Sequence, residues 1–293
     1  MSDADPVAPD DSDPAVSGDS SGDVPNELDA DVTSEPGDDV PLRVTNLRKT
    51  FGGIVAVDGA SFDVERESIT GLIGPNGAGK STTFNLITGV YRPDAGRVVF
   101  NGIDITGKSP NYIANLGLVR TFQIARELSK MTVIENLLLS PKGQVGESLW
   151  RSVLPGYRNA VVEQETELLD RVWRTMEFFE IDHLAHEQAG TLSGGQRKLL
   201  ELSRALLTDP DVLLLDEPMA GVNPSLEVKL LERIHDLRAD GYTFLLVEHD
   251  MDVIMNNCDR VIVMHQGRVL KTGTPDEIRA DELVIEAYLG GEV

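Results

Sequence analysis

The chain has 293 residues, which is enough for one large domain or two smaller ones. Its 26 Lys and Arg residues against 49 Asp and Glu residues give a formal net charge of −23, which excludes a general nucleic-acid binder because phosphate contacts need a basic face. The single cysteine, Cys258, excludes an internal disulfide and a cysteine zinc cluster, and it fits a reducing compartment.

The first 41 residues differ in composition from the rest. Residues 1–41 contain 13 Asp or Glu and no Lys or Arg, and they are rich in Ser, Pro and Gly. Such a segment is too polar to bury a core, so we expect a disordered acidic tail over 1–41 and a folded domain over 42–293. The rest of the chain is acidic too, and Arg outnumbers Lys, which favours a salt-adapted host; an ordinary acidic cytosolic protein is the alternative.

No stretch of the sequence approaches the roughly 18 consecutive apolar residues of a membrane span. The N-terminus is acidic where a secretory signal is basic. We therefore expect a soluble chain whose membrane role, if it has one, comes through a partner.

The first predicted strands form a small antiparallel layer. Apolar and polar residues alternate over 42–47 and, less strictly, over 56–64, as they do in half-buried strands. A third strand over 98–100 ends at the turn Asn101-Gly102.

Between these strands lies a phosphate-binding loop. The apolar run 68–73 predicts a strand, 74–81 reads GPNGAGKS, and 82–87 is compatible with a helix. Three glycines let the backbone N–H groups point inward, and the helix adds the positive end of its dipole, so the loop can cradle a polyphosphate. Lys80 would reach the outer phosphates, and the Ser81 hydroxyl would ligate Mg²⁺. A glycine-rich turn that matches by chance is the alternative, and the loop alone does not separate kinases, GTPases, helicases and transport ATPases.

The remaining elements alternate between helices and strands. Helical patterns cover 168–179, 199–207 and about 224–238, whereas 141–157 reads as a loop or insertion. Short apolar runs over 212–215 and 243–247 predict buried strands, so a parallel, helix-covered sheet follows. The final elements are a hairpin of 261–264 and 268–270 and a short helix that holds Leu283, Ile285 and Leu289.

Carboxylates follow one of the buried strands. Asp216 and Glu217 end the strand at Leu215, and the carboxyl ends of parallel strands are where open α/β sheets place ligands. Asp216 can hold Mg²⁺, and Glu217 can orient or deprotonate an attacking water. An incidental acidic strand end is the alternative. His249 follows the next strand and is a candidate contact of the γ-phosphate, although a lone histidine there is usually structural.

A second candidate anion site opens the helix that runs through Leu207. Ser193 offers a hydroxyl, and Gly194 and Gly195 expose N–H groups at a helix N-terminus in the sequence LSGGQ, which ends at Gln196. A helix cap without a ligand is the alternative.

Together these motifs resemble those of the ATP-binding cassette (ABC) ATPases, in the order typical of that family. They are Walker A at 74–81, the Q-loop at Gln123, the signature at 192–196, Walker B at 212–216 with Glu217, the D-loop at 220–223 and the switch histidine His249. The resemblance covers about 42 to the C-terminus. It implies an α/β P-loop NTPase fold of the ABC ATPase type: a mostly parallel core sheet, an antiparallel β layer, and a helical subdomain over about 124–207 inserted in the RecA-like core.

The resemblance also implies the site residues. The catalytic residues would be Glu217, His249, Lys80 and Gln123. The metal ligands would be Ser81, Gln123 and Asp216. The ATP-binding residues would be Phe51, Gly74, Pro75, Asn76, Gly77, Ala78, Gly79, Lys80, Ser81, Thr82, Ser193, Gly194, Gly195 and Gln196. Phe51 fits the family's adenine-stacking aromatic; an exposed strand phenylalanine is the alternative.

In this family two cassettes pair head to tail, so Ser193 would bind ATP held by the partner's P-loop. The expected ligands are ATP and Mg²⁺. The expected partners are transmembrane permease subunits, a second cassette in a homodimer or heterodimer and, indirectly, an extracellular solute-binding protein, with no nucleic acid. The chain would lie in the cytoplasm, peripheral on the inner face of the cell membrane.

Within the family, the stretches 87–93 and 117–123 and the ending Glu286-Ala287-Tyr288-Leu289-Gly290 are similar to the ATPase subunits of branched-chain amino acid importers. Met219 and Asn223 depart from the common Thr and Asp at their positions and are interpreted as subgroup variation. We therefore expect an ATP hydrolase that powers amino-acid import. An importer for another solute such as urea, or a soluble ABC ATPase outside transport, is the alternative.

Overall fold

The computed structural model describes residues 39–121, 126–141 and 158–289. The elements in chain order are β1 (Leu42–Phe51), β2 (Ile54–Val64), β3 (Ile69–Ile73), α1 (Lys80–Ile87), β4 (Ala95–Phe100), β5 (Ile103–Asp104), α2 (Pro110–Asn115), β6 (Leu118–Arg120), the 3₁₀ helix η1 (Arg126–Lys130), α3 (Val133–Leu138), α5 (Arg158–Phe178), the 3₁₀ helices η3 (Asp182–Leu184) and η4 (Ala189–Thr191), α6 (Gly194–Leu206), β7 (Val212–Asp216), α7 (Pro224–Ala239), β8 (Thr243–Val247), α8 (Met251–Asn257), β9 (Arg260–His265), β10 (Arg268–Gly273), α9 (Pro275–Arg279) and α10 (Glu282–Leu289).

The smaller sheet is antiparallel and has the strand order β2-β1-β4-β5. Leu42 and Val44 of β1 are buried, whereas Arg43 between them is exposed, as the alternation of the sequence predicts. The register shifts between Val44 and Leu47, where Asn46 has a φ of 48°. This bulge returns Leu47 to the buried face of the sheet.

The larger sheet has the order β10-β9-β3-β8-β7-β6. The pairs from β9 to β6 are parallel, and only the pairing of β10 with β9 in this sheet is antiparallel among the described residues. Every residue of β3 and β8 is buried, which explains why their sequences are continuous apolar runs. Because β3, β7 and β8 are parallel neighbours, their carboxyl ends meet at one edge of this sheet.

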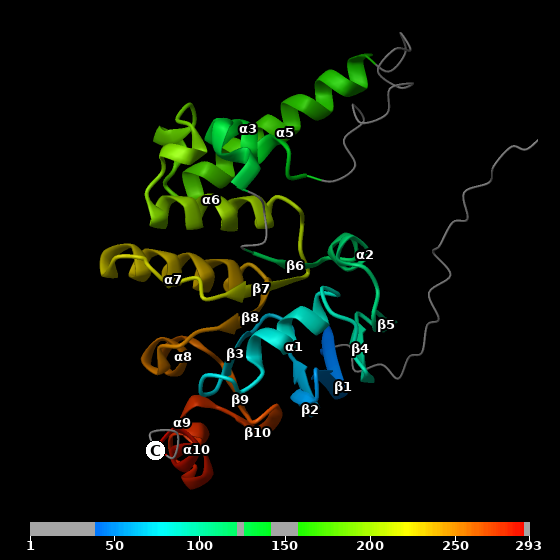
Figure 1. Cartoon of the computed structure of the whole chain (residues 1–293). Helices are drawn as coiled ribbons and strands as arrows, with labels where there is room; N and C mark the ends of the chain where they lie inside the picture. The colour runs from blue at the N-terminus through cyan, green and yellow to red at the C-terminus, as the bar shows by residue number, and fades with distance from the viewer. Residues whose placement is uncertain (1–38, 122–125, 142–157, 290–293) are drawn as a thin grey trace, which may run out of the picture. The chain divides into compact units, whose positions relative to one another are not determined.

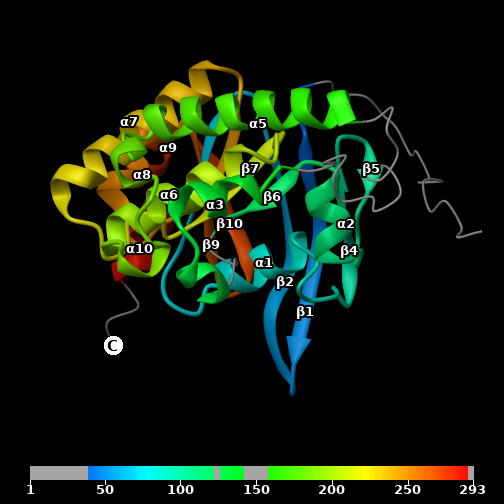
Figure 2. The same cartoon turned by 90° about the horizontal axis from the view of Figure 1, so that it is seen from above.

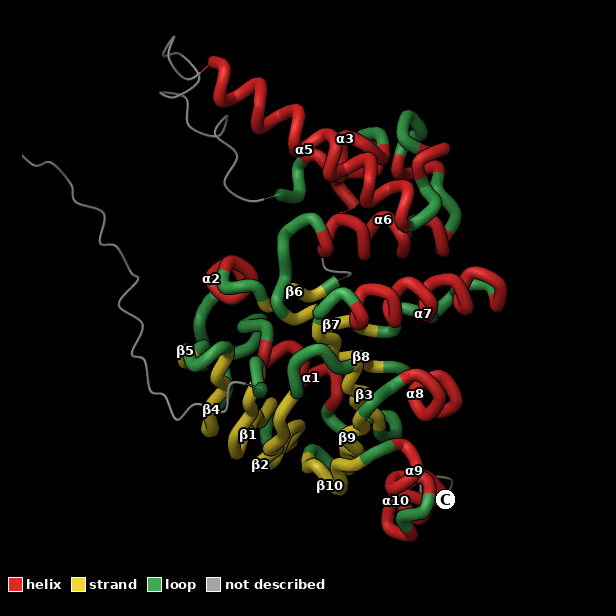
Figure 3. Tube along the Cα trace, turned by 180° about the vertical axis from the view of Figure 1, so that it is seen from behind, coloured by secondary structure: helices red, strands yellow, loops and turns green. Residues whose placement is uncertain are grey.

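Two hydrophobic cores cover the two faces of the larger sheet. Leu213 and Leu215 of β7 join a core with α3, α5, α6, α7 and α8, whereas Val212 and Leu214 join a core with α1 and the antiparallel sheet. Figures 1 and 3 show α7 and α8 on one side of the sheet and α1 with β1, β2 and β4 on the other. The period of two along β7 therefore divides its side chains between both layers.

A helical part precedes β7 in the chain. The α3 helix begins with a capping box of Thr132 and Glu135 and packs against α5 and α6 (Figure 2). Val172 and Met176 of α5 are fully buried in the first core, as expected from their four-residue spacing. The predicted helix over 168–179 is the second half of the longer α5.

Several elements differ from the sequence predictions. The helix after the phosphate loop begins at Lys80, two residues before the predicted start. The sequence analysis did not predict α2, β5, β6, α8 or α9. The expected tail up to residue 38 and the expected loop over 142–157 lie outside the described residues.

Candidate functional site

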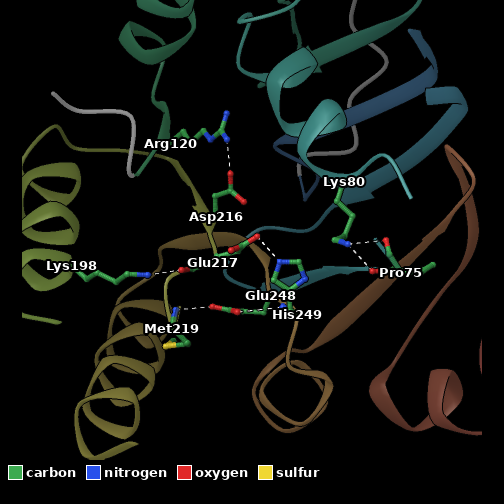
Figure 4. Close-up of polar contacts among 10 residues, drawn as sticks. Pro75, Lys80, Arg120, Lys198, Asp216, Glu217, Met219, Glu248 and His249 are labelled. Atoms are coloured by element: carbon green, nitrogen blue, oxygen red, sulfur yellow. Dashed lines mark hydrogen bonds and ion pairs between the residues drawn. The ribbon is translucent and has the colours of Figure 1, made fainter. Parts of the chain in front are cut away.

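The phosphate-binding loop joins β3 to α1, as predicted. Lys80, the first residue of α1, is buried, and its Nζ donates to the carbonyl oxygens of Gly74 at 2.6 Å and Pro75 at 3.2 Å (Figure 4). Burial lowers the pKa of Lys80, whereas the nearby Glu217 and Asp216 carboxylates raise it. The fold thus brings Lys80 of the P-loop close enough to Asp216 and Glu217 for their charges to interact.

Glycine is required at both ends of this loop. Gly74 has a φ of 154°, and a Cβ there would lie 2.1 Å from the Met264 carbonyl oxygen. Gly79 has a φ of 100°, and a Cβ there would lie 2.5 Å from the Ala56 carbonyl oxygen. Gly77, in contrast, faces open space. The close packing of its ends fixes the loop between β9 and β2.

Asp216 ends β7 and forms an ion pair that the sequence analysis missed. Arg120, at the end of the neighbouring strand β6, donates to Asp216 at 2.5 Å (Figure 4). It also donates to Asn85 of α1 at 2.6 Å. Both charged side chains are mostly buried. Arg120 therefore links the strand that carries Asp216 to the helix that follows the P-loop.

Glu217 is held by its backbone. It has a φ of 51°, its N–H donates to the Val247 carbonyl oxygen at 2.8 Å, and its own carbonyl oxygen accepts from Lys198 of α6 at 2.6 Å. Its carboxylate lies toward His249, whose Nε2 is 2.6 Å from Glu217 Oε1 (Figure 4). The structure thus brings Glu217 and His249 together, as the resemblance implies.

Glu248 is a second residue that the sequence analysis did not single out. This carboxylate is buried and accepts from the Met219 N–H at 2.7 Å (Figure 4). Burial raises the pKa of Glu248, and the Met219 hydrogen bond lowers it. Glu248 lies between β8 and His249 and holds the segment after Glu217 in place through this hydrogen bond. The signal available in the sequence was the three-residue run 248–250, in which two carboxylates flank a histidine.

The signature segment forms the first turn of α6. Ser193 caps this helix, and its hydroxyl and the Gln196 side chain form a capping box. A Cβ on Gly194 would approach no atom closer than 3.7 Å, whereas a Cβ on Gly195 would lie 2.0 Å from Leu226 Cδ2. Gly195 thus permits close packing of α6 on α7, and Gly194 leaves the helix N-terminus open.

The two candidate anion sites line different pockets of the chain. Ser193, Gln196 and Asn223 line one pocket, together with residues of η3 and α7. The P-loop residues 75–78 line another, beside α10. Within one chain the signature and the P-loop are therefore separate surfaces.

Phe51 and Gln123 are two further residues that the resemblance implies for the site. Phe51 at the end of β1 is 41% exposed and packs edge to face on Tyr91, with ring centroids 5.2 Å apart. Lys49 Nζ lies 5.4 Å from the Phe51 ring centroid. Gln123 lies outside the described residues.

Among residues 39–121, 126–141 and 158–289, no helix combines the length and apolar character needed to cross a membrane. In that same part of the chain, no group of three or more His, Cys, Asp or Glu residues is arranged to hold a metal ion.

Comparison with known proteins identifies the family. The family model described as "ABC transporter" matches residues 57–220, more than half of the chain. The chain is 45% identical over 251 residues to the "Probable branched-chain amino acid transport ATP-binding protein LivG" of Archaeoglobus fulgidus, covering 86% of this chain and 96% of that protein. The chain belongs to the ABC transporter family. The resemblance stated from the motifs is thereby confirmed.

Other ABC proteins support the same grouping. The family model "Branched-chain amino acid ATP-binding cassette transporter" matches residues 268–293. The chain is 41% identical over 252 residues to the "High-affinity branched-chain amino acid transport ATP-binding protein LivG" of Escherichia coli K12, covering 85% of this chain and 97% of that protein.

The ABC fold is confirmed by solved structures. An ATP-binding cassette of an ABC transporter in its ADP conformation is 38% identical, with a TM-score of 0.72, and the match covers 86% of this chain and 99% of that one. A nucleotide-free ABC cassette is 39% identical, also with a TM-score of 0.72, covering 85% and 98%. The predicted α/β P-loop fold is therefore correct, and the chain is a nucleotide-binding ABC ATPase.

Proposed function

We propose that this ABC ATPase is the ATP-hydrolysing subunit of an importer for branched-chain amino acids. The observation that carries the proposal is the match of the C-terminal residues 268–293 to the branched-chain family, alongside near-full-length relatives named for the same transport. The ATPase part is common to the whole ABC family, whereas this C-terminal segment favours the amino-acid group.

The site supports phosphoryl transfer from ATP to water. The amides of the P-loop and the Lys80 ammonium would stabilise charge on the phosphates. Glu217 would orient or deprotonate the attacking water, because its carboxylate is already placed beside His249. His249 and Gln123 would contact the γ-phosphate.

The residues present fit Mg²⁺. The Ser81 hydroxyl and the Asp216 carboxylate are oxygen donors, which this hard cation prefers. Gln123, the third ligand that the resemblance implies, lies outside the described residues, and phosphate oxygens would supply the other ligands. When bound, Mg²⁺ would neutralise charge on the β- and γ-phosphates. Asp216 would have to share its carboxylate with Arg120, which holds it from β6.

The separation of the two anion sites within one chain supports a paired arrangement. Ser193 and the open Gly194 amide lie in a pocket apart from the P-loop, so they would bind ATP held by a second cassette. A homodimer and a heterodimer both satisfy this geometry. ATP would then stabilise the closed pair, and hydrolysis would release it.

The partners would be transmembrane permease subunits, with an extracellular solute-binding protein acting through them. The chain would lie on the cytoplasmic face of the cell membrane. In that arrangement the permease and the solute-binding protein select the solute, and this chain supplies the free energy of ATP hydrolysis.

An uptake experiment in the host tests the proposal. A strain that lacks this chain should lose uptake of radiolabelled leucine, the wild-type gene should restore it, and a Glu217→Gln gene should not. Unlabelled isoleucine and valine should compete with the label, whereas urea should not. If the strain without this chain lost urea uptake and kept normal leucine uptake, urea would be the transported solute in place of the branched-chain amino acids. Normal uptake of both, with capture of ribosomal or DNA-repair proteins by the tagged chain, would contradict a transport role.

A further inference from the structure

Glu217 has a backbone conformation that residues with a side chain rarely adopt. Its φ of 51° lies in the left-handed region, where a Cβ is unfavourable. Such a conformation costs free energy and persists only where the surrounding structure fixes it. Pro218 and Met219, which follow, are buried, so the chain turns away from β7 into packed surroundings. The position of the Glu217 carboxylate therefore depends on the groups that hold this turn.

Hydrogen bonds from two other elements hold the turn. On the side of β8, the Glu217 N–H donates to the Val247 carbonyl oxygen at 2.8 Å. Glu248, directly after β8, accepts from the Met219 N–H at 2.7 Å. From α6, Lys198 Nζ donates to the Glu217 carbonyl oxygen at 2.6 Å (Figure 4). The turn that carries Glu217 is thus fixed between β8 and the helix that begins at the signature.

Lys198 makes the stronger of two hydrogen bonds to the Glu217 carbonyl oxygen. The Ala220 N–H donates to the same oxygen at 3.2 Å from within the turn, whereas Lys198 brings a shorter bond from a cation. The Lys198 side chain is half-buried. Burial lowers the Lys198 pKa, and three nearby carboxylates raise it: Glu248, Glu201 and Glu217. Removal of the lysine would leave this oxygen with the weaker, neutral donor.

The α6 helix gives Lys198 a packed support. Ser193 caps this helix, and Gly195 lets its first turn lie closely on Leu226 of α7. The two leucines that follow Lys198 are buried in the first hydrophobic core. Lys198 therefore extends from a packed helix, and a shift of α6 would move its ammonium relative to Glu217.

We propose that Lys198 is a positioning residue for Glu217, whose carbonyl it holds so that the carboxylate faces the attacking water. The proposal rests on the function proposed above, in which Glu217 acts on that water. Because Lys198 acts through the backbone of Glu217, its effect falls on the hydrolytic step and not on ATP binding. Glu217 is then in place only while α6 packs beside the turn.

The test compares Lys198→Met and Lys198→Arg with a matched control, Lys271→Met. Lys271 of β10 also holds one oxygen, that of Asp281 at 3.0 Å, but it is not among the site residues. ATP affinity, kcat and KM are measured on the purified full-length chains. Lys198→Met should lower kcat by about ten- to hundredfold, since a small displacement of a catalytic group costs this much, and should leave ATP affinity unchanged. Lys198→Arg keeps a charged donor and should retain most of kcat, and Lys271→Met should behave as wild type.

A double variant separates positioning from a general structural effect. A residue that acts only through another has no effect once the other is removed. Lys198→Met should therefore not lower phosphate release further in a chain that already carries Glu217→Gln. A further loss by the same factor would overturn the proposal, and so would wild-type kcat in Lys198→Met.

Urea unfolding establishes that each variant is folded. If Lys198→Met does not fold, Lys198→Gln, whose amide is a neutral donor, replaces it in both measurements with the same expected results. Loss of kcat in Glu217→Gln without any loss in the Lys198 variant would contradict only the role of Lys198. Equal phosphate release by wild type and Glu217→Gln would contradict the proposed role of Glu217 and, with it, the positioning role of Lys198.

Discussion

Three cations organise the site at the scale of single residues, and each contacts a particular oxygen. Lys80 holds the Gly74 carbonyl, Arg120 holds the Asp216 carboxylate and Lys198 holds the Glu217 carbonyl. The motifs predicted Lys80, Asp216, Glu217 and His249, because each of these residues stands in a short run that is recognisable by itself. Arg120 and Lys198 could not be predicted, since their partners lie 96 and 19 residues away in the sequence. Glu248 stands in the recognisable run 248–250, but its hydrogen bond with Met219, 29 residues away, is decided by the tertiary fold.

Arg120 should contribute strongly to stability. In Arg120→Met the mostly buried Asp216 carboxylate loses its partner, so the free energy of unfolding should fall by about 2–4 kcal/mol. The matched control is Arg48→Met, because Arg48 lies 3.6 Å from Asp58 in an exposed pair, and it should cost less than about 1 kcal/mol. Urea unfolding of both variants measures the difference. Equal losses would show that the Arg120 pair is no stronger than a surface pair.

Glu248 should make stability depend on pH. Because its pKa is raised in the folded chain, the native state binds more protons than the unfolded state above the ordinary value of 4.5. The free energy of unfolding should therefore decrease as the pH rises from this value through the folded pKa. Glu248→Gln keeps an acceptor for the Met219 N–H and removes the titration, so this decrease should be smaller in the variant.

The control for Glu248 is Glu135→Gln. Backbone and side-chain hydrogen bonds from Thr132 lower the Glu135 pKa, so its contribution is present above 4.5 and is lost as the pH falls through the folded pKa. Glu135→Gln should change the free energy of unfolding only through this loss at acidic pH. Urea midpoints measured across the pH range separate the two effects; an unchanged slope in Glu248→Gln would show that Glu248 does not titrate as inferred.

Elements with a strong sequence period were predictable, and short ones were not. The strands β3, β7 and β8 are buried on both faces and therefore read as apolar runs. The three-residue strand β6 is too short for a period, and α8 is specified mainly by Asp250, whose side chain caps its first N–H groups. Tertiary pairing, which the local sequence does not report, decides such elements.

The contact of α6 with α7 depends on a single glycine. Gly195→Ala would place a Cβ 2.0 Å from Leu226 Cδ2, so Leu226 must shift, and we expect a loss of about 1–3 kcal/mol in the free energy of unfolding. A Cβ at Gly194 in the same turn would lie 3.7 Å from the Gly221 carbonyl oxygen, an ordinary van der Waals contact, so Gly194→Ala should stabilise the helix by up to about 1 kcal/mol. Urea unfolding compares the pair, and equal effects would contradict the packing argument.

At the scale of the whole molecule, charge and fold have separate consequences. The ABC cassette was predictable because its motifs occur in a fixed order, whereas the groove that Tyr288 and Gly77 both line was not, since these two residues are 211 positions apart. The net charge of −23 does not determine the fold, but it produces repulsion that salt screens.

Stability should therefore increase with salt. Because potassium chloride screens the repulsion among carboxylates, the urea midpoint of the full chain should rise between about 0.1 M and 2 M potassium chloride, over which the screening length falls from about 10 Å to below 3 Å. Maximal stability at low salt would contradict both this expectation and the hypothesis of a salt-adapted host.

We expect the chain to hydrolyse ATP with Glu217 orienting or deprotonating the attacking water. Phosphate release by the purified chain with ATP and Mg²⁺ is compared with that of Glu217→Gln. The variant should bind ATP as the wild type does, release phosphate at least about a hundredfold more slowly and accumulate as an ATP-bound dimer. Equal phosphate release by the two proteins would contradict the catalytic role of Glu217.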